Sequence, residues 1–194
     1  MIKQPKLFLV GGPNGAGKST FAKKFLAENP DYIFLNADEI ARTLNPEDVH
    51  AVRFEAGRAF LTNMAAFRER GANLVVESTL SGVSLAQQIQ LFVEAGYYIN
   101  LTYVFLASPE MSVNRVAGRV LDGGHHVPTA DILRRVGRSK KNFWHTYRLL
   151  ADEWQLVFNA DTGFIYVAKL VQRNLTVFNH PVFRLFLQEQ GINS

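Results

Sequence analysis

The stretch from Gly12 to Ser19 reads GPNGAGKS and satisfies the pattern G-x-x-x-x-G-K-[ST]. An apolar run at residues 6–10 precedes it and predicts a buried strand, and a helix-compatible segment at 19–28 follows it. A strand, a glycine-rich turn and a helix in this order make a cradle for phosphate, because backbone N–H groups and the positive end of the helix face the anion. The alternative, a chance glycine-rich turn, does not explain this context. The motif therefore predicts a P-loop that binds a nucleoside triphosphate.

The residues of this motif have separate expected tasks. Gly12, Gly15 and Gly17 let the backbone curl with its N–H groups turned inward. Lys18 can reach the β- and γ-phosphates, and the Ser19 hydroxyl can ligate Mg²⁺. ATP and Mg²⁺ are thus the expected cofactors. The expected nucleotide-binding residues are Gly12, Pro13, Asn14, Gly15, Ala16, Gly17, Lys18, Ser19 and Thr20.

Length and composition set wide limits on the rest. The 194 residues predict one domain over residues 1–194 with a substantial core. The absence of cysteine excludes disulfides and thiolate metal sites, and fits a reducing cytoplasm. No apolar run reaches the ~20 residues that a membrane helix needs, and the N-terminus has no signal-peptide pattern, so we expect a cytoplasmic protein without a membrane partner. A net charge of +4 suits an anionic ligand, whether nucleotide or nucleic acid.

Short apolar strands alternate with helices along the chain, which predicts an α/β fold. We expect a P-loop NTPase of the nucleotide-kinase kind: a five-stranded parallel sheet with helices on both faces and a helical lid at about 109–130. The tail predicts a hairpin and a last helix within 164–190. The expected strands are 6–10, 32–35, 73–77, 98–106 and 154–158, and the longer expected helices are 19–28, 48–70, 84–94 and 131–150.

Carboxylates follow two of these strands, at the sheet edge where parallel α/β folds bind ligands. Asp38 is the candidate general base, which accepts the proton of a substrate hydroxyl; the alternative is that Asp38 and Glu39 only charge the first turn of a helix. Glu77 could hold a substrate hydroxyl or organise the metal, or serve as a carboxylate at a helix N-terminus. Ser108, after the fourth strand, is expected in the same neighbourhood.

Arginines near the expected lid could stabilise the transferring phosphoryl group. Arg115 and Arg119 are four residues apart and share a helix face, which is either a catalytic face or a solvated one. Gly123, Gly124 and Pro128 suit a mobile cover, and the adjacent pair His125 and His126 belongs to that cover rather than to a metal site.

A basic run with interleaved aromatic residues follows at 134–148. It could bind RNA or an acidic partner, but a charged helix face with a buried aromatic side is favoured, so nucleic acid is not the expected partner. Arg134 or Arg135 could instead reach the triphosphate. The run contains Arg134, Arg135, Arg138, Lys140, Lys141 and Arg148, with Phe143, Trp144 and Tyr147 between them.

Five segments together resemble the zeta toxin family, the bacterial P-loop kinases of toxin–antitoxin systems. The phosphate loop alone is shared by very many NTPases, whereas its combination with the NADE and GGH segments is much more specific. The segments are 11–20 (GGPNGAGKST), 34–40 (FLNADEI), 74–82 (LVVESTLSG), 114–120 (NRVAGRV) and 123–128 (GGHHVP).

This resemblance implies a kinase that uses ATP and Mg²⁺ to phosphorylate the 3′-hydroxyl of UDP-N-acetylglucosamine. Asp38 matches the family's catalytic aspartate and Lys18 its phosphate-loop lysine, and the implied substrate-binding residues are Asp38, Glu77 and Thr79. Arg115 or Arg119 matches the first of two γ-phosphate arginines, giving the expected catalytic set Asp38, Lys18, Arg115 and Arg119. The second arginine falls where this chain has Gly-Gly-His-His, and Arg134 or Arg135 could replace it. The resemblance also implies an antitoxin as a possible partner.

Two alternatives stay open. The acceptor could be another hydroxyl, on a nucleoside, a small metabolite or an RNA end. The chain could also be a binding module, in which ATP closes the lid on a protein or RNA without turnover.

Overall fold

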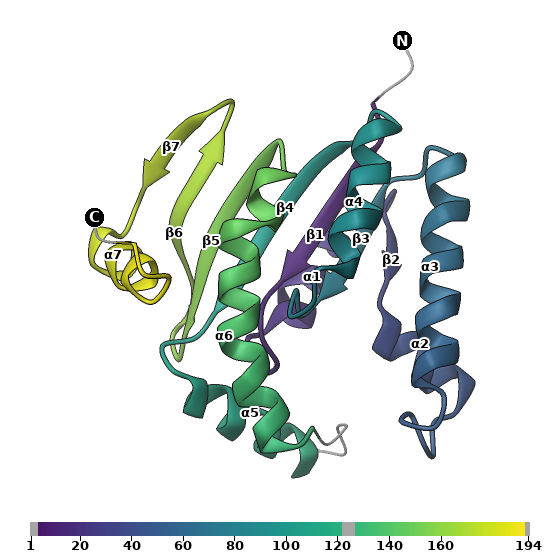
Figure 1. The fold of residues 1–194 in the computed structure, drawn as a ribbon, viewed down its shortest axis with the longest axis horizontal. Helices are drawn as coiled ribbons and strands as arrows, with labels where there is room; N and C mark the ends of the chain where they lie inside the picture. Colours follow the sequence, from purple (N-terminus) through teal and green to yellow (C-terminus); the bar gives the residue numbers. More distant parts are fainter. Residues whose placement is uncertain (1–3, 122–126, 193–194) are drawn as a thin grey trace.

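The computed structural model describes residues 4–121 and 127–192, and these form an α/β fold around one twisted sheet (Figure 1). The sheet has seven strands in the order β2-β3-β1-β4-β5-β6-β7. The first five are parallel, as predicted, and β6 and β7 are antiparallel and extend the sheet at one edge. These two strands, which add to the five expected parallel ones, form the hairpin predicted for the C-terminal segment. The strands are β1 (Lys6–Gly11), β2 (Ile33–Leu35), β3 (Leu74–Ser78), β4 (Tyr98–Phe105), β5 (Glu153–Ala160), β6 (Gly163–Val171) and β7 (Asn174–Val177).

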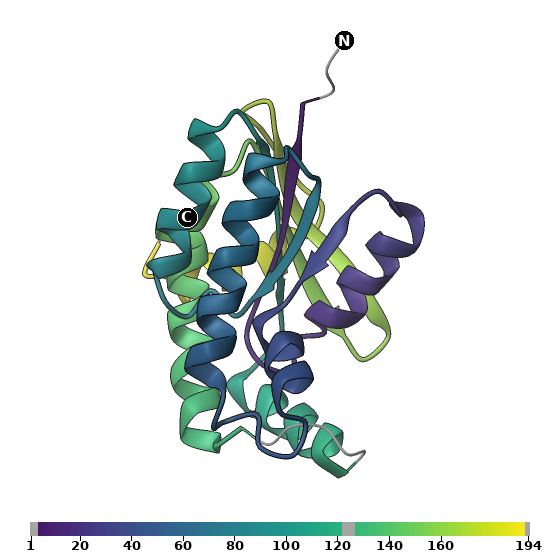
Figure 2. The same cartoon turned by 90° about the vertical axis from the view of Figure 1, so that its right-hand side faces the viewer.

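Helices cover both faces of this sheet, as expected. Figure 2 shows α3, α4 and α6 on one face and α1 on the other, with α2 and α5 beyond the carboxyl ends of the parallel strands. Two helices differ from their predicted extents: the expected helix at 48–70 begins at Arg53, and the one at 131–150 ends at His145 and is followed by a 3₁₀ turn, Tyr147–Leu149. The helices are α1 (Lys18–Glu28), α2 (Ala37–Leu44), α3 (Arg53–Glu69), α4 (Ser84–Glu94), α5 (Pro109–Leu121), α6 (Thr129–His145) and α7 (His180–Gln188).

The core divides into two layers because alternate residues of a strand point to opposite faces of the sheet. Leu7 and Leu9 of β1 pack with Phe60, Met64 and the other apolar residues of α3, α4, α6 and α7. The intervening side chains of β1 pack in a smaller cluster with α1 on the other face. The continuous apolar run at residues 7–10 of β1 follows from this burial on both faces.

The tail packs against α6 through an aromatic cluster. Phe143 of α6 is fully buried, and its ring lies in edge contact with those of Trp154 on β5 and Phe186 on α7. Lys140 of α6, itself buried, pairs with Glu189 just after α7. The aromatic side of the basic 134–148 run is therefore core, which agrees with the favoured interpretation of that segment. Across the described residues, no helix has both the length and the apolarity needed to span a membrane.

The strand order places the phosphate loop at a switch point. β1 lies between β3 and β4. After β1 the chain continues to the strands on the β3 side, whereas after β4 it continues to the strands on the opposite side. Ligands of open α/β sheets bind in the crevice that such a reversal leaves at the carboxyl ends. The loop after β1 opens into this crevice, with α2 and α5 beside it.

Candidate active site

The phosphate loop is tightly packed where it leaves the sheet. At Gly12 a Cβ atom would lie 2.1 Å from the carbonyl oxygen of Val104 on β4, a separation that no side chain tolerates. The Ala16 N–H donates to the carbonyl of Pro13 at 3.2 Å and closes the turn. Lys18 is then the first residue of α1. The motif glycine thus reflects contact with the neighbouring strand as well as a curved backbone.

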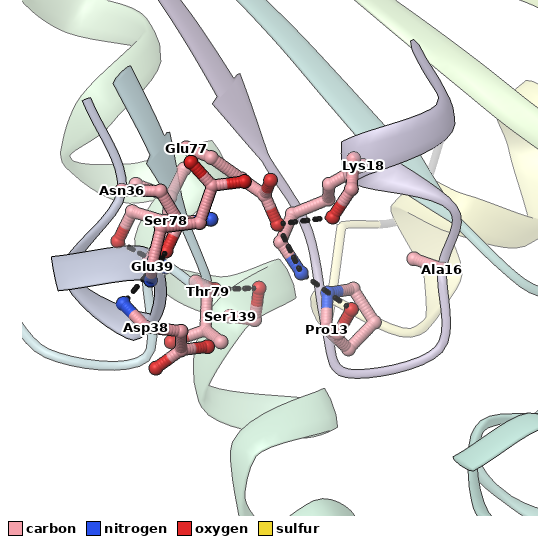
Figure 3. A network of polar contacts seen from close by, with 12 residues as sticks. Pro13, Ala16, Lys18, Asn36, Asp38, Glu39, Glu77, Ser78, Thr79 and Ser139 are labelled. Carbon is pink, nitrogen blue, oxygen red and sulfur yellow. Dashed lines mark hydrogen bonds and ion pairs between the residues drawn. The ribbon is translucent and has the colours of Figure 1, made fainter. Parts of the chain in front are cut away.

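Lys18 is buried at the centre of the site (Figure 3). Its ammonium donates to the Pro13 carbonyl at 3.1 Å and lies 3.9 Å from Oε1 of Glu77. Burial lowers the pKa of Lys18 below its ordinary value, while the charges of Glu77 and, less strongly, Asp38 oppose that shift. Arg119 and Arg135 act in the same direction as burial. These four charges therefore lie close enough to influence the lysine that is expected to grip the phosphates.

Ser19 and Glu77 together offer oxygen atoms suited to a hard cation. The Ser19 hydroxyl donates to Glu77 Oε1 at 3.0 Å, and the second carboxylate oxygen, Oε2, is buried without a hydrogen-bond partner. Magnesium at kinase sites is bound by few protein groups, with phosphates and water as its other ligands. The described part of the chain holds no cluster of three or more acidic or histidine side chains that could form an all-protein metal site. The serine–carboxylate pair fits Mg²⁺ on these grounds.

Asp38 lies in the first turn of α2, at the mouth of the site. The Asn36 side chain caps this helix by accepting the N–H of Asp38 at 2.7 Å and that of Glu39 at 3.4 Å. Both acidic residues thus charge the helix start, as the alternative interpretation expected. Only Asp38, however, lines the cavity beside the phosphate loop, and Glu39 does not. A carboxylate that is exposed on this cavity can meet a bound hydroxyl.

The cavity next to the phosphate loop has a volume of about 350 Å³ and is rich in charge. It lies between α2 and α3 on one side and α5 and α6 on the other. Among the described residues, four arginines and one histidine line it, against two aspartates, so this lining suits an anionic ligand. The lining residues are Asn14, Ala37, Asp38, Ala41, Arg42, Val49, His50, Arg53, Ala56, Arg119, Val127, Pro128, Asp131 and Arg135.

The two arginines expected on α5 lie in different surroundings. Arg119 lines the cavity, whereas Arg115 does not and instead lies 3.4 Å from both the Asn159 carbonyl and Oδ1 of Asp161. They are four residues apart, yet only Arg119 faces the space beside Asp38. The expected lid residues Gly123, Gly124, His125 and His126 fall outside the described residues.

The arginines after the expected lid also separate. Arg135 lines the cavity, while Arg134 is largely exposed and pairs with Asp131 at 2.7 Å, one helical turn before it. The sequence left both open as candidates for the triphosphate. Arg119 and Arg135 therefore line the same cavity as Asp38, but from its opposite side.

Thr79 and Ser108 have structural partners in the chain. The Thr79 hydroxyl lies 2.9 Å from that of Ser81, and its carbonyl accepts the Ser139 hydroxyl. Ser108 accepts the N–H of Met111 at 3.4 Å in the first turn of α5. Neither Thr79 nor Glu77 is among the cavity-lining residues. Glu77 lies on the phosphate-loop side, whereas Asp38 lies on the cavity side.

Sequence reasoning missed much of the cavity. Arg42, His50 and Arg53 come from the end of α2, the turn after it and the start of α3, and no motif marks them. Their only sequence signal is positive charge near a predicted helix end. Arg42 is oriented by a 3.3 Å hydrogen bond from its Nε to the carbonyl of Asp38, one turn earlier.

Known proteins share both sequence and fold with this chain. The Zeta toxin family model matches residues 1–167. An uncharacterized protein of Haemophilus influenzae is 30% identical over 126 residues, which cover 65% of this chain and 89% of that protein.

Two solved structures share the fold at lower identity. A chain of the AvrRxo1-ORF1:-ORF2 complex crystallised with ATP is 20% identical, with a TM-score of 0.75 over 96% of this chain and 64% of that one. A chain from the PezAT chromosomal toxin–antitoxin system of Streptococcus pneumoniae is 20% identical, with a TM-score of 0.68 over 95% of this chain and 78% of that one. The present chain thus spans less than two thirds of the matched AvrRxo1 chain.

Proposed function

The chain belongs to the zeta toxin family, and from this premise we propose that it is a kinase that uses ATP and Mg²⁺. The proposed reaction moves the γ-phosphate to a hydroxyl of UDP-N-acetylglucosamine or a related nucleotide sugar. One observation carries the proposal: an exposed carboxylate, Asp38, and the phosphate loop border the same cavity, which has room for a small molecule. An acceptor hydroxyl and the terminal phosphate of ATP can meet there.

In the proposed reaction the acceptor hydroxyl lies against Asp38, which takes its proton. The hydroxyl oxygen forms the new bond to the γ-phosphorus as the bond from that phosphorus to the β-phosphate oxygen breaks, and ADP leaves. Lys18 holds the phosphates at the loop. Ser19, with Glu77 beside it, would hold Mg²⁺, which would neutralise part of the charge of the phosphates when bound.

Arg119 and Arg135 are the proposed cations on the transferring group. They line the cavity with Asp38, and both influence the pKa of Lys18, so their charges lie near the phosphate-loop lysine. Charge on the equatorial oxygens of the moving phosphoryl group is what such cations stabilise. Arg135 takes the place of the second arginine that the family resemblance implied within the 123–126 segment.

The positive charge of the opposite cavity wall supports the proposed class of acceptor. Arg42 and Arg53 line the cavity from α2 and α3, away from the arginines of α5 and α6. An acceptor that carries phosphate groups of its own would use these guanidinium groups, since arginine binds phosphate in a planar, two-pronged geometry. A nucleotide sugar has this combination of free sugar hydroxyls and a diphosphate.

The substrate assignment is tested with purified protein, Mg²⁺ and γ-labelled ATP. The mixture is offered UDP-N-acetylglucosamine, other nucleotide sugars, and free sugars without a diphosphate, with Asp38→Asn as the inactive control. We expect label on a nucleotide sugar and none on the free sugars. Transfer to free sugars or nucleosides instead would overturn the acceptor class, and ATP binding with no transfer across a metabolite extract would overturn the kinase.

The proposal includes a toxic activity of this chain and an antitoxin protein that would inhibit it. The fold is shared with a chain of a toxin–antitoxin system, and the family is named for its toxins. Expression of the wild-type chain should then arrest growth, and expression of the Asp38→Asn variant should not. Equal growth of the two strains would contradict a toxic activity.

A further inference from the structure

A side chain that is distant in the sequence forms a hydrogen bond with the backbone of the phosphate loop. Asn159 lies near the end of β5, and its amide Nδ2 donates to the carbonyl oxygen of Ala16 at 2.8 Å. The two residues are 143 positions apart, and Ala16 is fully buried. A carbonyl in the middle of a loop has no strand or helix partner, so its bond to this amide satisfies a group that burial would otherwise leave costly.

This contact fixes the direction of one peptide plane. In a trans peptide the C=O and the following N–H point to opposite sides. Because the Ala16 oxygen points to β5, the N–H of Gly17 points away from β5. The Lys18 ammonium lies beside Glu77 of β3, on the side of β1 away from β5, so we expect a phosphate to meet the backbone donors on that side.

The backbone conformation and the position of Asn159 both favour glycine at position 17. A Cβ atom there would lie 2.4 Å from Asn159 Nδ2, and the backbone of Gly17 has φ +92°, which disfavours any other residue. The asparagine amide thus occupies the space that a side chain would need. The loop and Asn159 fit each other as a pair.

Arg115 contacts the main chain at Asn159. Its guanidinium lies 3.4 Å from the Asn159 carbonyl and 3.4 Å from Asp161, in the turn between β5 and β6. The stem of Arg115 passes over the loop, since a Cβ at Gly15 would lie 3.3 Å from the Arg115 Cβ. The middle of α5 and the end of β5 are therefore joined beside the phosphate loop.

We propose that Asn159 is a positioning residue for the nucleotide's phosphates: it holds the Ala16–Gly17 peptide so that the loop's N–H groups face the phosphate chain. This rests on the ATP binding in the proposed function, but not on the acceptor. Arg115 belongs to the same support, which gives it a role in ATP binding and separates it from Arg119. The effect of losing Asn159 should fall on phosphate binding and not on the acceptor.

A matched pair of variants tests this role. Asn142 on α6 makes the same kind of bond, from its amide Nδ2 to the carbonyl of Leu80 at 2.9 Å, in the loop after β3. We expect Asn159→Ala to weaken ATP binding roughly tenfold, as loss of a partner to a buried carbonyl predicts. Asn142→Ala should change the ATP dissociation constant by less than about twofold, since it supports a different loop. Titration calorimetry on the full chain measures both.

A second ligand distinguishes phosphate positioning from contact with the base. Inorganic tripolyphosphate should lose affinity for Asn159→Ala by the same factor as ATP, because the supported peptide faces the phosphates. Unchanged tripolyphosphate binding, or equal ATP losses in the Asn142 and Asn159 variants, would overturn the proposal. If Asn159→Ala does not fold, Asn159→Ser, whose hydroxyl is too short to reach Ala16, serves in its place. A wild-type protein that binds ATP but phosphorylates no nucleotide sugar would remove the proposed acceptor and leave this inference intact.

Discussion

The phosphate loop and the acceptor cavity are adjacent at the carboxyl edge of the sheet, yet they are built in different ways. The loop comes from one continuous stretch, packs without spare space against β4 and β5, and has its lysine buried. The cavity is lined by long side chains from α2, α3, α5 and α6, and several of these residues are exposed. The phosphate-loop half consists mainly of backbone that packing holds in place, whereas the cavity half is an open space lined by charged side chains.

This difference separates the two recognition tasks. Phosphate is bound by backbone N–H groups whose directions depend on close packing, so few residues there can change. The acceptor meets side chains on separate helices, and each can be exchanged without moving the loop. A family built this way can keep ATP as donor while its acceptor differs among members.

The largest expected effect lies where the two halves meet, at Asp38. Asp38→Asn removes the proposed proton acceptor but keeps the size of the side chain and the helix start, so kcat should fall by about 10²–10⁴. The dissociation constant for ATP should stay within about twofold, because the loop is untouched. Steady-state kinetics and calorimetry give the two numbers.

Glu39→Gln is the control for Asp38. It changes the same charge in the same turn of α2 but at a residue that does not line the cavity. Its kcat should match wild type within about twofold. An equal loss in both variants would mean that Asp38 acts only through the helix start.

The next effect concerns the arginines on the cavity wall. Arg119→Ala and Arg135→Ala should each lower kcat by about 10²-fold, since each removes a cation that we propose stabilises the transferring phosphoryl group. Arg134→Ala, the adjacent and exposed residue that pairs with Asp131, should leave kcat nearly unchanged. Comparable losses at 134 and 135 would show that the basic charge of α6 matters, rather than the direction of one side chain.

The sequence predicted the phosphate-loop half well because that half is local. The strand, the glycine turn and Lys18 are consecutive, and the parallel order of the strands brings Asp38 and Glu77 to the same edge. The five parallel strands follow from their apolar runs, and the tail hairpin was also predictable. Helix ends were less accurate, as at Arg53, where the apolar period begins before the backbone is helical.

The cavity half resisted prediction because helical periodicity does not tell which side of a helix faces an opening. Arg134 and Arg135 are neighbours in sequence and differ by about 100° around α6, so only the packing of the helix decides which one lines the cavity. Arg115 was grouped with Arg119 by their spacing, yet Arg115 contacts the Asn159 carbonyl on β5 and Asp161 in the turn after it, away from the cavity. Asn159 carried no signal, since nothing in the motif names a partner 143 residues later.

A smaller effect is expected for the two arginines on the acceptor side of the cavity. Arg42→Ala and Arg53→Ala should raise the KM for a nucleotide-sugar acceptor about tenfold, with the KM for ATP within about twofold, because a charge-assisted bond to phosphate is lost on the cavity side alone. Arg58→Ala, on α3 but outside the cavity lining, is the control. An equal rise in the KM for ATP would show that these arginines also affect nucleotide binding, and that the phosphate loop and the cavity are not independent.

The smallest expected effect is on pH dependence, and it comes from Lys18. Burial lowers the pKa of Lys18 below its ordinary value, and Glu77 is the largest influence opposing that shift. ATP binds the charged ammonium better, so above the lysine's lowered pKa binding must take up a proton, and affinity falls as pH rises.

Glu77→Gln removes the main raising influence, so the pKa of Lys18 should fall further and the loss of ATP affinity should begin at a lower pH. Calorimetry in two buffers of different ionisation enthalpy, without Mg²⁺, counts the protons taken up at each pH and avoids the effect of Glu77 on the metal. Asp38→Asn should move the onset in the same direction by a smaller amount, because its charge ranks below that of Glu77 at the lysine. A larger shift from Asp38→Asn than from Glu77→Gln would reverse the assignment of Glu77 to the phosphate side and Asp38 to the acceptor side.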